Sequence, residues 1–348
     1  MKITTTKRDL VTALTSISGC IASRSTLPVL QCVLIDSDLG IMGTDLEAAA
    51  LVALKSTIDE PGAVAVPYSR LLGFCKTLPN TDITLETKGA DIIVSASGYK
   101  ATFRTIDADE FPRVQYNTGE EIEIKGFSGL VLDVIGAAST DIARPMLTGV
   151  YLTLKDGRLY AVSADGYQMA TSWIDSDISL DLVIPAKSLG YVAKQAMGQS
   201  ASIILGDNLI QFNVGDDTYW ITQLDGTFPN VFGVIPKDEA VASCVVDGLA
   251  GAVQSVIAAA GNDANHIKLS SDGNNELIVT SSSNENKAKA VLSVQCPDAF
   301  EIAINAKYLV NGLGPKESTL EFRARTKPLV IKHSEHIVNV IMPMHMTE

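Results

Sequence analysis

The chain has 348 residues, of which 46% are hydrophobic and 19% are charged, and its formal net charge is −13. This length allows two or three domains with cores of their own. No apolar run is long enough to cross a membrane as a helix, and the N-terminal sequence lacks the apolar core of a signal peptide, so we expect a cytoplasmic protein with no membrane partner. The acidic balance argues against a general nucleic-acid binder, although net charge does not fix the charge of any one face.

The cysteines are five in number, and no pair has the CxxC spacing of a redox or metal site: Cys20, Cys32, Cys75, Cys244 and Cys296. An odd count without paired spacing is typical of small buried side chains. We therefore expect neither disulfides nor zinc ligands.

The first third of the chain reads as a strand at residues 2–5, a helix, a group of strands, a second helix and a second group of strands. Apolar residues at helical spacing mark the first helix: Leu10, Ala13, Leu14, Ile17 and Ile21. The second helix has its apolar residues at Leu71, Phe74, Cys75 and Leu78. We expect the further strands at 29–36, 40–44, 48–54, 82–87, 91–97 and 100–105.

The middle third repeats this order. A strand at 121–125 precedes a helix with its apolar face at Val131, Val134, Ile135 and Ala138. The expected strands lie at 149–154, 159–163, 168–173, 202–205, 209–214 and 218–223.

The stretch Asp181–Met197 joins an apolar strand end to a helix that we expect to begin at Pro185, since proline suits a first helical position. Its buried stripe consists of Leu189, Val192, Ala193 and Ala196. Lys187 and Lys194 lie on the opposite face of this helix.

The last third repeats the order again, with a long helix and then a shorter one that follows Asn305. The apolar face of the long helix contains Leu249, Ala252, Val253, Val256, Ile257 and Ala260. The expected strands lie at 241–246, 267–271, 277–281, 288–294, 319–323, 329–333 and 337–342, and EIAINAKYLVNGL at 301–313 repeats the unit of a strand that leads into a helix.

Matching positions recur at the spacing of a whole domain. Pro67, Pro185 and Asn305 each precede the second helix of a third, at spacings of 118 and 120 residues. This triplication predicts domains at 1–119, 120–237 and 238–348, with net charges of −2, −7 and −4. With two helices and about eight strands in each repeat, the fold class is α+β. If the repeats join edge to edge, their helices can line one side of an arc.

Four motifs in these repeats resemble the bacterial sliding clamp, the beta subunit of DNA polymerase III. They are GTDLE at 43–47, ADGYQMA at 164–170, DGTFPNVFGVIP at 225–236 and VIMPMHM at 340–346. The resemblance covers the full length. It implies three clamp domains per chain, two helices packed on antiparallel sheets in each, and a head-to-tail homodimer that closes into a ring. It also implies a processivity factor that performs no chemistry and needs no cofactor or metal.

The family encircles duplex DNA without regard to sequence, and this function fits weak contacts between cations and phosphates. The resemblance implies that the DNA contacts come from the second helices of the repeats and from two loops: Arg24, Lys76, Arg144, Lys187, Lys194 and Lys307. Lys76 occupies the position of Lys194, and Lys307 that of Lys187. The loop after Arg144 has Pro145-Met146 where other members often have two aromatic residues.

The family also binds short peptides with apolar anchors, and the methionine-rich C-terminus suits an adaptable binding surface. The partners implied are the DNA polymerase catalytic subunit, the clamp loader, repair polymerases and other proteins with the peptide motif. Carried over by position, the pocket consists of Leu147, Ala164, Gly166, Tyr167, Gln168, Met169, Pro229, Val234, Val340, Ile341, Met342, Pro343, Met344 and Met346. Gln168 and Gly233 stand where the family often has basic residues, so we expect a less basic pocket.

An enzyme built on the same scaffold is the main alternative, but the sequence has no phosphate-binding glycine loop and no GxSxG. Asp45 and Asp165 are repeat equivalents, with Ser283 in the third repeat, and we expect them to accept hydrogen bonds from backbone N–H groups in turns. His333 and His336 are expected on opposite faces of a strand, which argues against a metal site. A clamp-like protein that no longer encircles DNA is the third possibility, and the retained lysines argue against it.

Overall fold

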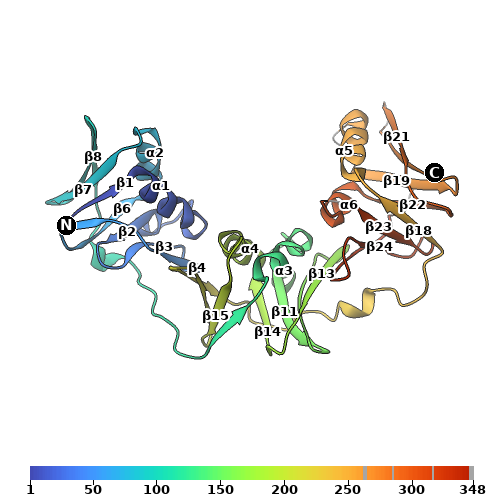
Figure 1. Ribbon diagram of the computed structural model, residues 1–348, viewed down its shortest axis with the longest axis horizontal. Helices are drawn as coiled ribbons and strands as arrows, with labels where there is room; N and C mark the ends of the chain where they lie inside the picture. The colour runs from blue at the N-terminus through green and yellow to red at the C-terminus, as the bar shows by residue number, and fades with distance from the viewer. Residues whose placement is uncertain (262–264, 284–285, 316, 345–348) are drawn as a thin grey trace. The chain divides into compact units, whose positions relative to one another are not determined.

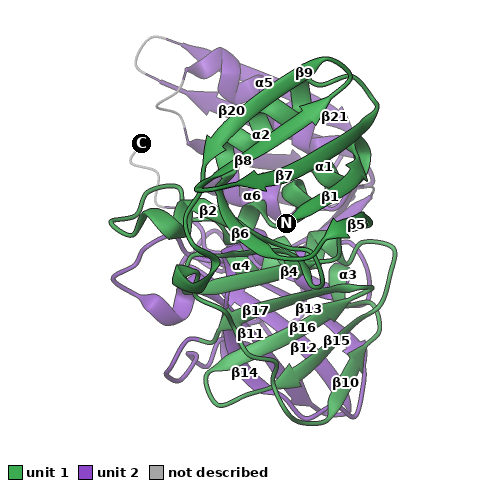
Figure 2. Ribbon diagram, turned by 90° about the vertical axis from the view of Figure 1, so that its left-hand side faces the viewer, with its two compact units in different colours: residues 1–128, 188–223 green, residues 129–187, 224–348 purple. Residues whose placement is uncertain are grey.

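The computed structural model describes residues 1–261, 265–283, 286–315 and 317–344. Helices lie against antiparallel sheets, as the α+β class requires (Figure 1). The chain divides into two compact units, each assembled from separate stretches of sequence (Figure 2). Unit 1 contains residues 1–128 and 188–223, and unit 2 contains residues 129–187 and 224–348.

The helices form where apolar residues repeat at helical spacing. They are α1 (Lys7–Ser16), α2 (Tyr68–Thr77), α3 (Phe127–Leu132), α4 (Ala186–Gln195), α5 (Leu249–Ala260) and α6 (Ala306–Gly312). Shorter 3-10 segments are η1 (Ser18–Cys20), η2 (Pro28–Gln31), η3 (Ala108–Glu110), η4 (Ile135–Ala137), η5 (Pro145–Thr148) and η6 (Phe232–Val234). Side chains cap two of the helices, because Thr6 accepts from the N–H of Asp9 and Asn305 from that of Lys307.

Unit 1 contains two sheets. The five-stranded sheet has the order β5-β1-β7-β8-β9, with β1 (Lys2–Thr6), β5 (Thr57–Glu60), β7 (Asp82–Lys88), β8 (Asp91–Ala96) and β9 (Tyr99–Arg104). The eight-stranded sheet has the order β10-β15-β16-β17-β4-β3-β2-β6. Its strands are β2 (Cys32–Asp36), β3 (Gly40–Thr44), β4 (Ala48–Val52), β6 (Ala63–Pro67), β10 (Glu121–Ile124), β15 (Ala201–Leu205), β16 (Leu209–Val214) and β17 (Asp217–Thr222).

Unit 2 also contains two sheets. The eight-stranded sheet has the order β14-β11-β12-β13-β25-β24-β23-β18, with β11 (Gly149–Lys155), β12 (Arg158–Ala164), β13 (Gln168–Asp175), β14 (Asp181–Pro185), β18 (Ala242–Val246), β23 (Ser318–Phe322), β24 (Leu329–Lys332) and β25 (Ile337–Ile341). The four-stranded sheet has the order β21-β20-β19-β22. Its strands are β19 (His266–Asp272), β20 (Glu276–Ser282), β21 (Lys287–Ser293) and β22 (Ala299–Asn305).

Each eight-stranded sheet joins four strands of one sequence repeat to four strands of the next. In unit 1 the join is the antiparallel pair β4–β17, in which Ala50 lies opposite Tyr219. In unit 2 it is the pair β13–β25, in which Ala170 lies opposite Asn339. The middle repeat therefore contributes half of its strands to each unit.

Three local predictions are wrong in detail. The strand expected at 29–36 begins as η2, since Pro28 has no N–H to give to a sheet, and β2 starts only at Cys32. The helix expected over 131–138 is split into α3 and η4, because Gly136 and the β-branched Val131, Val134 and Ile135 all lower helix propensity. Pro185 is the last residue of β14, and α4 begins at Ala186.

The prediction of no disulfide is also wrong. Cys244 and Cys296 form one, although 52 residues separate them in the chain. Val245 donates its backbone N–H to the carbonyl of Gln295 (3.0 Å), and this antiparallel bridge places the two neighbouring cysteines side by side. Cys20, Cys32 and Cys75 are buried, as expected.

His333 and His336 lie in the turn between β24 and β25 rather than on a strand. The ring of His336 packs edge-on against the ring of Trp173 with 4.3 Å between centroids. The backbone N–H of Trp173 also donates to the backbone carbonyl of His336 (3.2 Å). This turn therefore belongs to the packing of unit 2.

Candidate functional site

Helix α4 packs on the end of α1 through one side chain. Tyr191 donates its hydroxyl to the carbonyl of Ser16, and its ring lies against Gly19. Burial raises the pKa of Tyr191 to about 12, so its hydroxyl stays protonated and able to donate. Tyr219 of β17 lies edge-on to this ring at 6.3 Å and completes an aromatic junction inside unit 1.

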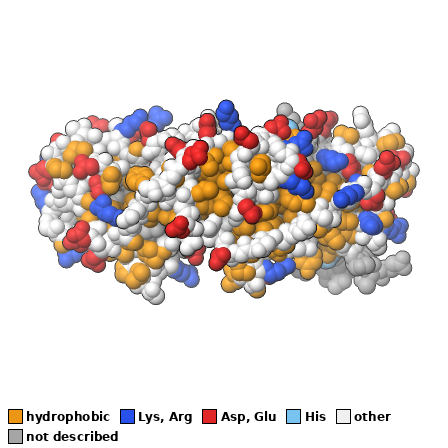
Figure 3. Space-filling view, turned by 90° about the horizontal axis from the view of Figure 1, so that it is seen from below, with side chains coloured by type: hydrophobic (Ala, Val, Ile, Leu, Met, Phe, Trp, Pro, Cys, Tyr) orange, Lys and Arg blue, Asp and Glu red, His pale blue; other side chains and the backbone are white. Residues whose placement is uncertain are grey.

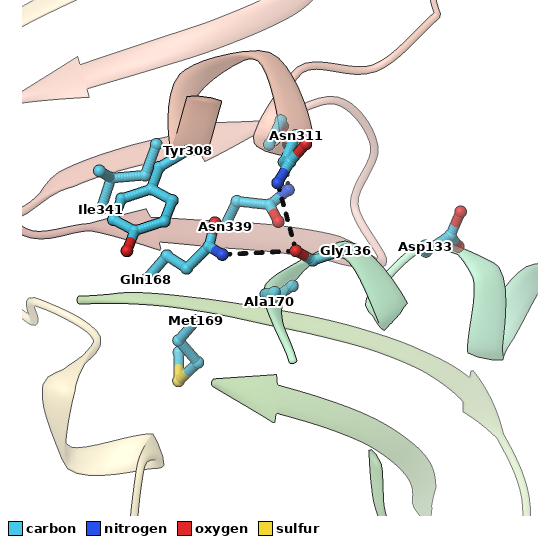
Figure 4. A pocket seen from close by; sticks show the side chains of 11 residues that line it. Asp133, Gly136, Gln168, Met169, Ala170, Tyr308, Asn311, Asn339 and Ile341 are labelled. Carbon is cyan, nitrogen blue, oxygen red and sulfur yellow. Dashed lines mark hydrogen bonds between the residues drawn. The ribbon is translucent and has the colours of Figure 1, made fainter. Parts of the chain in front are cut away.

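The equivalent junction in unit 2 consists of amides. The carbonyl of Gly136 accepts from the side chains of Asn311 (3.2 Å) and Gln168 (3.3 Å) (Figure 4). Asn339 donates its side-chain amide to the carbonyl of Gly312 (3.0 Å). These residues line a cavity of about 10 Å³, which is roughly the room that one water molecule needs. The two junctions thus occupy matching places in the fold but use different chemistry.

The cations expected to contact DNA are all exposed. Lys187 and Lys194 lie on α4 opposite the stripe of Leu189, Val192, Ala193 and Ala196, and each of these four side chains is at most 1% exposed. Lys76 lies in the last turn of α2, and Lys307 in the first turn of α6. The placement of these lysines on solvent-facing helix surfaces agrees with the amphipathic pattern of the sequence.

The two loop arginines differ from each other. Arg24 is exposed in the loop between η1 and η2. Arg144 forms an ion pair with Asp141, with 3.2 Å between Nε and Oδ2. The hydrogen bonds from Ala143 and Arg144 lower the pKa of Asp141, so this carboxylate is charged and offsets part of the positive charge of Arg144.

Charges alternate on the face seen in Figure 3, where Lys and Arg side chains are interspersed with Asp and Glu, and hydrophobic side chains gather towards the middle. A basic footprint does not extend over this whole face.

An apolar cluster in unit 2 joins strands β11–β13 and β25 to the segment at 224–236. Buried members are Val162, Ala164, Met169, Val183, Phe228, Val231, Val330 and Val340. Phe228 stacks on Tyr151 with 5.1 Å between ring centroids, and Phe232 packs edge-on against Tyr160 at 5.3 Å. Lys155 lies 4.6 Å from the centre of the Phe232 ring, a cation–π contact. Aromatic anchors therefore fix the segment that carries Pro229 and Val234.

Most of the expected pocket residues lie in or beside this cluster. Leu147, Ala164, Met169 and Val340 belong to it. Tyr167, Val234 and Met342 are large apolar side chains with 61%, 44% and 38% of their surface exposed. Gly166 and Pro229 are exposed, and Pro343 and Met344 are partly buried. Met342 donates its N–H to the carbonyl of Tyr167 (2.8 Å), which ties the C-terminal segment to the loop between β12 and β13. Met346 lies outside the described residues.

Two of the expected pocket residues lie elsewhere. Ile341 belongs to the core cluster that contains Val253 and Leu320, not to the cluster of its neighbour Val340, because successive strand residues face opposite sides. Gln168 is opposite Ile341 in the strand pair and uses its amide in the junction with Gly136. Sequence position alone could not separate these two faces.

The aromatic residues of the cluster were not predicted from the sequence. Two aromatic pairs, Tyr151 with Phe228 and Tyr160 with Phe232, hold the segment at 224–236 against strands β11 and β12. The signal available in the sequence was the spacing of Phe228 and Phe232 in a segment with two prolines, which indicates an anchored loop rather than a free one.

The turns at Asp45 and Asp165 confirm the structural role predicted for these carboxylates. Asp45 accepts from the N–H groups of Glu47 (3.1 Å) and Ala48 (2.8 Å). Asp165 accepts from those of Tyr167 (2.8 Å) and Gln168 (2.9 Å). In the third repeat Ser283 accepts from Asn286 (3.2 Å). In each case one side chain caps the turn between two strands of a sheet.

Within the part of the chain that the structure describes, none of the helices combines the length and apolar character needed to span a membrane. In the same residues, no group of three or more His, Cys, Asp and Glu side chains is placed to hold a metal ion.

Comparison with known proteins agrees over the whole chain. Residues 1–115 match the N-terminal domain of the DNA polymerase III beta subunit, and residues 121–230 match its central domain. The beta sliding clamp of Pseudomonas aeruginosa is 30% identical over 68% of each chain, and that of Synechococcus elongatus is 26% identical over 99% of this chain and all of the relative.

The fold agrees as well. The DNA polymerase sliding clamp of Bacillus subtilis superposes with a TM-score of 0.87 at 24% identity and covers all of both chains. A sliding clamp of Pseudomonas aeruginosa crystallised with a ligand gives 0.84 at 25% identity, over 99% of this chain and all of the other. The chain belongs to the family of beta sliding clamps, the beta subunits of DNA polymerase III.

Proposed function

We propose that two copies of this chain close head to tail into a ring around duplex DNA and tether a DNA polymerase to it through the apolar cluster of unit 2. The family is one of processivity subunits rather than enzymes. The observation that carries the proposal is the matching join in the two eight-stranded sheets, which shows how one repeat adds its strands to the next. We place this activity in the cytoplasm, where bacterial DNA lies.

Three repeats, bounded at 1–119, 120–237 and 238–348, account for this arrangement. Each repeat supplies two groups of neighbouring sheet strands, with five strands in the group that ends at β9 and four in each of the others. Each join connects the β2–β4 type of group to the β15–β17 type of group in the next repeat. One group at each end of the series lacks a neighbouring repeat. Their edge strands are β9 and β21, and a second copy of the chain supplies the neighbour that each of them needs.

The ring would be held on DNA by topology, so its contacts to phosphate need only be weak. We infer that Lys76, Lys187, Lys194 and Lys307 provide these contacts, together with Arg24. Exposed lysines on long flexible stems give no sequence readout and exchange readily between phosphates, which suits sliding. Arg144 contributes less, because its ion pair with Asp141 offsets part of its positive charge.

The rim of Tyr167, Val234 and Met342 supports a site for short peptides with apolar anchors. Polymerase catalytic subunits, the clamp loader, repair polymerases and other proteins that carry such a motif are the partners we propose. Gln168 does not reach this rim, and Gly233 brings no charge, so Lys237, which follows Val234 by three residues, is the cation closest in sequence to the residues that form it.

Retention on DNA tests the ring. A labelled chain is loaded onto nicked circular duplex DNA with a clamp loader and ATP, and half of the sample is then linearised with a restriction enzyme. We expect the chain to stay on the circle and to leave the linear DNA within minutes. Equal loss from both forms, with the loading step verified by gel filtration, would contradict topological binding.

A further inference from the structure

The edges that would close the ring are both basic. This inference rests on the proposed ring and deepens it, because it concerns which residues meet where the second copy is joined. The unpaired edges are those of β9 in unit 1 and β21 in unit 2, the outermost strands of their sheets. The pairing registers inside the chain determine how they would meet.

The register on the β9 side follows from three matching hairpins. Across β7–β8–β9, Leu85 lies opposite Val94, which lies opposite Ala101. The corresponding rows are Ile203, Phe212 and Tyr219 in the second repeat, and Leu320, Ile331 and Asn339 in the third. Ala101 is therefore the equivalent of Tyr219 and Asn339.

The register on the β21 side follows in the same way. Gly43 lies opposite Ala50, Ser163 opposite Ala170, and Ser281 opposite Ala288. The capped turns agree with this alignment, because Asp45, Asp165 and Ser283 each donate their N–H to the carbonyl three residues on. Ala288 is therefore the equivalent of Ala50 and Ala170.

Both internal joins pair these equivalent positions: Ala50 with Tyr219, and Ala170 with Asn339. The same rule places Ala288 opposite Ala101 of a second copy. The two faces agree with this register, because Ala288 packs towards α5 and the neighbouring inward residue of β9, Phe103, packs edge-on against Phe74 of α2. A one-residue slip would place inward side chains opposite outward ones.

We propose that ring closure sets Lys100 directly opposite Lys289 of the second copy, with Lys287 facing Thr102. The internal joins hold uncharged pairs at the places of the two lysines, namely Thr218 with Leu51 and Val338 with Thr171. At this position of the join, the two pairs inside the chain are uncharged, whereas the pair between two copies consists of two lysines.

The charges around the two lysines do not cancel them among the described residues. Lys100 lies opposite Ser95 on its own sheet, and Lys289 opposite Thr280. Arg104, at the end of β9, has an ion pair with Asp91 (3.6 Å), so that carboxylate is already engaged. Directly opposed like charges destabilise a strand pair, and salt screens their repulsion. The ring should therefore close more tightly as salt rises, which is the reverse of the behaviour of an ion-paired interface.

Charge reversal tests this inference. Dissociation of the full chain is measured by sedimentation or by dilution of labelled protein at low and high NaCl. We expect Lys100→Glu and Lys289→Glu each to lower the dissociation constant about tenfold at low salt, since each converts repulsion into attraction at both closures of the ring. The salt dependence should change sign in both variants.

The double variant Lys100→Glu with Lys289→Glu restores like charges and should return to the wild-type dissociation constant and salt dependence. Lys125→Glu is the matched control, because it makes the same change in net charge at an exposed site away from both edges. It should leave the dissociation constant unchanged.

The outcomes separate this inference from the ring itself. If the chain forms dimers whose dissociation neither the single reversals nor salt alters, the Lys100–Lys289 pair is wrong and the ring stands. If the chain forms no dimer at any concentration or salt, and none of the variants forms one, the ring and the pair both fail. A double variant that dimerises more tightly than either single variant also overturns direct pairing.

Discussion

The ring of Tyr191 lies so close to Gly19 that a β-carbon on the glycine would come within 2.5 Å of it. The hydroxyl at the other end of the same side chain donates to Ser16. One tyrosine thus fixes α4 to the first repeat by shape and by hydrogen bonding together. At the equivalent position of unit 2, the nearest atom to a β-carbon on Gly136 is Asn311 Cβ at 3.8 Å.

This difference predicts opposite responses to the same substitution. Gly19→Ala forces the Tyr191 ring to move and should lower the free energy of unfolding by about 1–3 kcal/mol, the usual cost of overpacking. Gly136→Ala has room for the added methyl group and should change the free energy of unfolding by well under ~1 kcal/mol. Urea denaturation of the two variants checks this. Equal losses in both would show that the close approach at Gly19 is not what holds α4.

DNA association should depend on the helix lysines. Lys187→Glu with Lys194→Glu should weaken equilibrium binding to duplex DNA and reduce the slope of log affinity against log salt by roughly one for each phosphate that the variant no longer neutralises. Both side chains are exposed, so the thermal unfolding midpoint should not fall. Lys125→Glu is the control for a single charge reversal, and it is compared with Lys187→Glu and Lys194→Glu made one at a time. Fluorescence anisotropy at several salt concentrations measures the slopes, and an unchanged slope would remove α4 from the DNA contacts.

Peptide binding should depend on the exposed rim of the apolar cluster. Val234→Asp places a carboxylate on the exposed apolar rim, and a bound peptide would bury this charge without a partner. The variant should therefore abolish stimulation of the polymerase and leave the dimer and the melting temperature unchanged. Val241→Asp is a matched control, since Val241 is 66% exposed and lies outside this cluster. Stimulation that survives Val234→Asp would place the peptide elsewhere on the chain.

The disulfide should contribute to the stability of unit 2. Cys244→Ala with Cys296→Ala opens a loop of 52 residues, and loops of this size give losses of about 2–5 kcal/mol in the free energy of unfolding. The reductant dithiothreitol should lower the stability of the wild type in the same way and leave that of the double variant unchanged. Cys75→Ala removes a buried thiol from unit 1 and leaves the disulfide in place, so the stability of this variant should still fall when dithiothreitol is added. A wild type indifferent to reductant would show that the bond carries no stability.

Stability should also change with pH through His333. Burial lowers the pKa of His333, and the carboxylate of Asp133 opposes this shift. The unfolded chain therefore binds a proton more readily than the folded one, so the stabilising effect of the neutral ring is complete above about pH 6.5 and is lost as the pH falls below that value. His333→Gln should reduce the difference in unfolding free energy between pH 7.5 and pH 5.5. An identical pH profile in the variant would assign the effect to another group.

Much of the fold follows from periodicity in the sequence. The buried stripe of α4 was visible as Leu189, Val192, Ala193 and Ala196, and the capped turns were visible as the matching Asp45 and Asp165. Both features are local, because helix faces and turns depend on residues a few positions apart. Repetition of such local patterns at a spacing of about one domain was enough to indicate the triplicated α+β class.

Features that depend on distant segments were not accessible in this way. The Cys244–Cys296 bond requires knowing that β18 runs beside residue 295, and the separation of Val340 from Ile341 requires knowing which side of β25 faces the apolar cluster. The same limit applies to the anchors of the peptide rim. Tyr151 and Phe228 stack across segments 77 residues apart, a distance that sequence spacing cannot bridge.

The division of the middle repeat between two sheets has a consequence for how the protein can be made. During synthesis, β2, β3, β4 and β6 leave the ribosome well before β15, β16 and β17, so the edge of β4 must wait unpaired until about residue 222 has emerged. A fragment limited to 121–230 would expose two sheet edges, at β17 and β13. Unpaired edge strands can pair with other chains and so cause aggregation. The middle repeat therefore needs both of its neighbours before its sheets are complete, whereas each outer repeat needs only one neighbour within the chain.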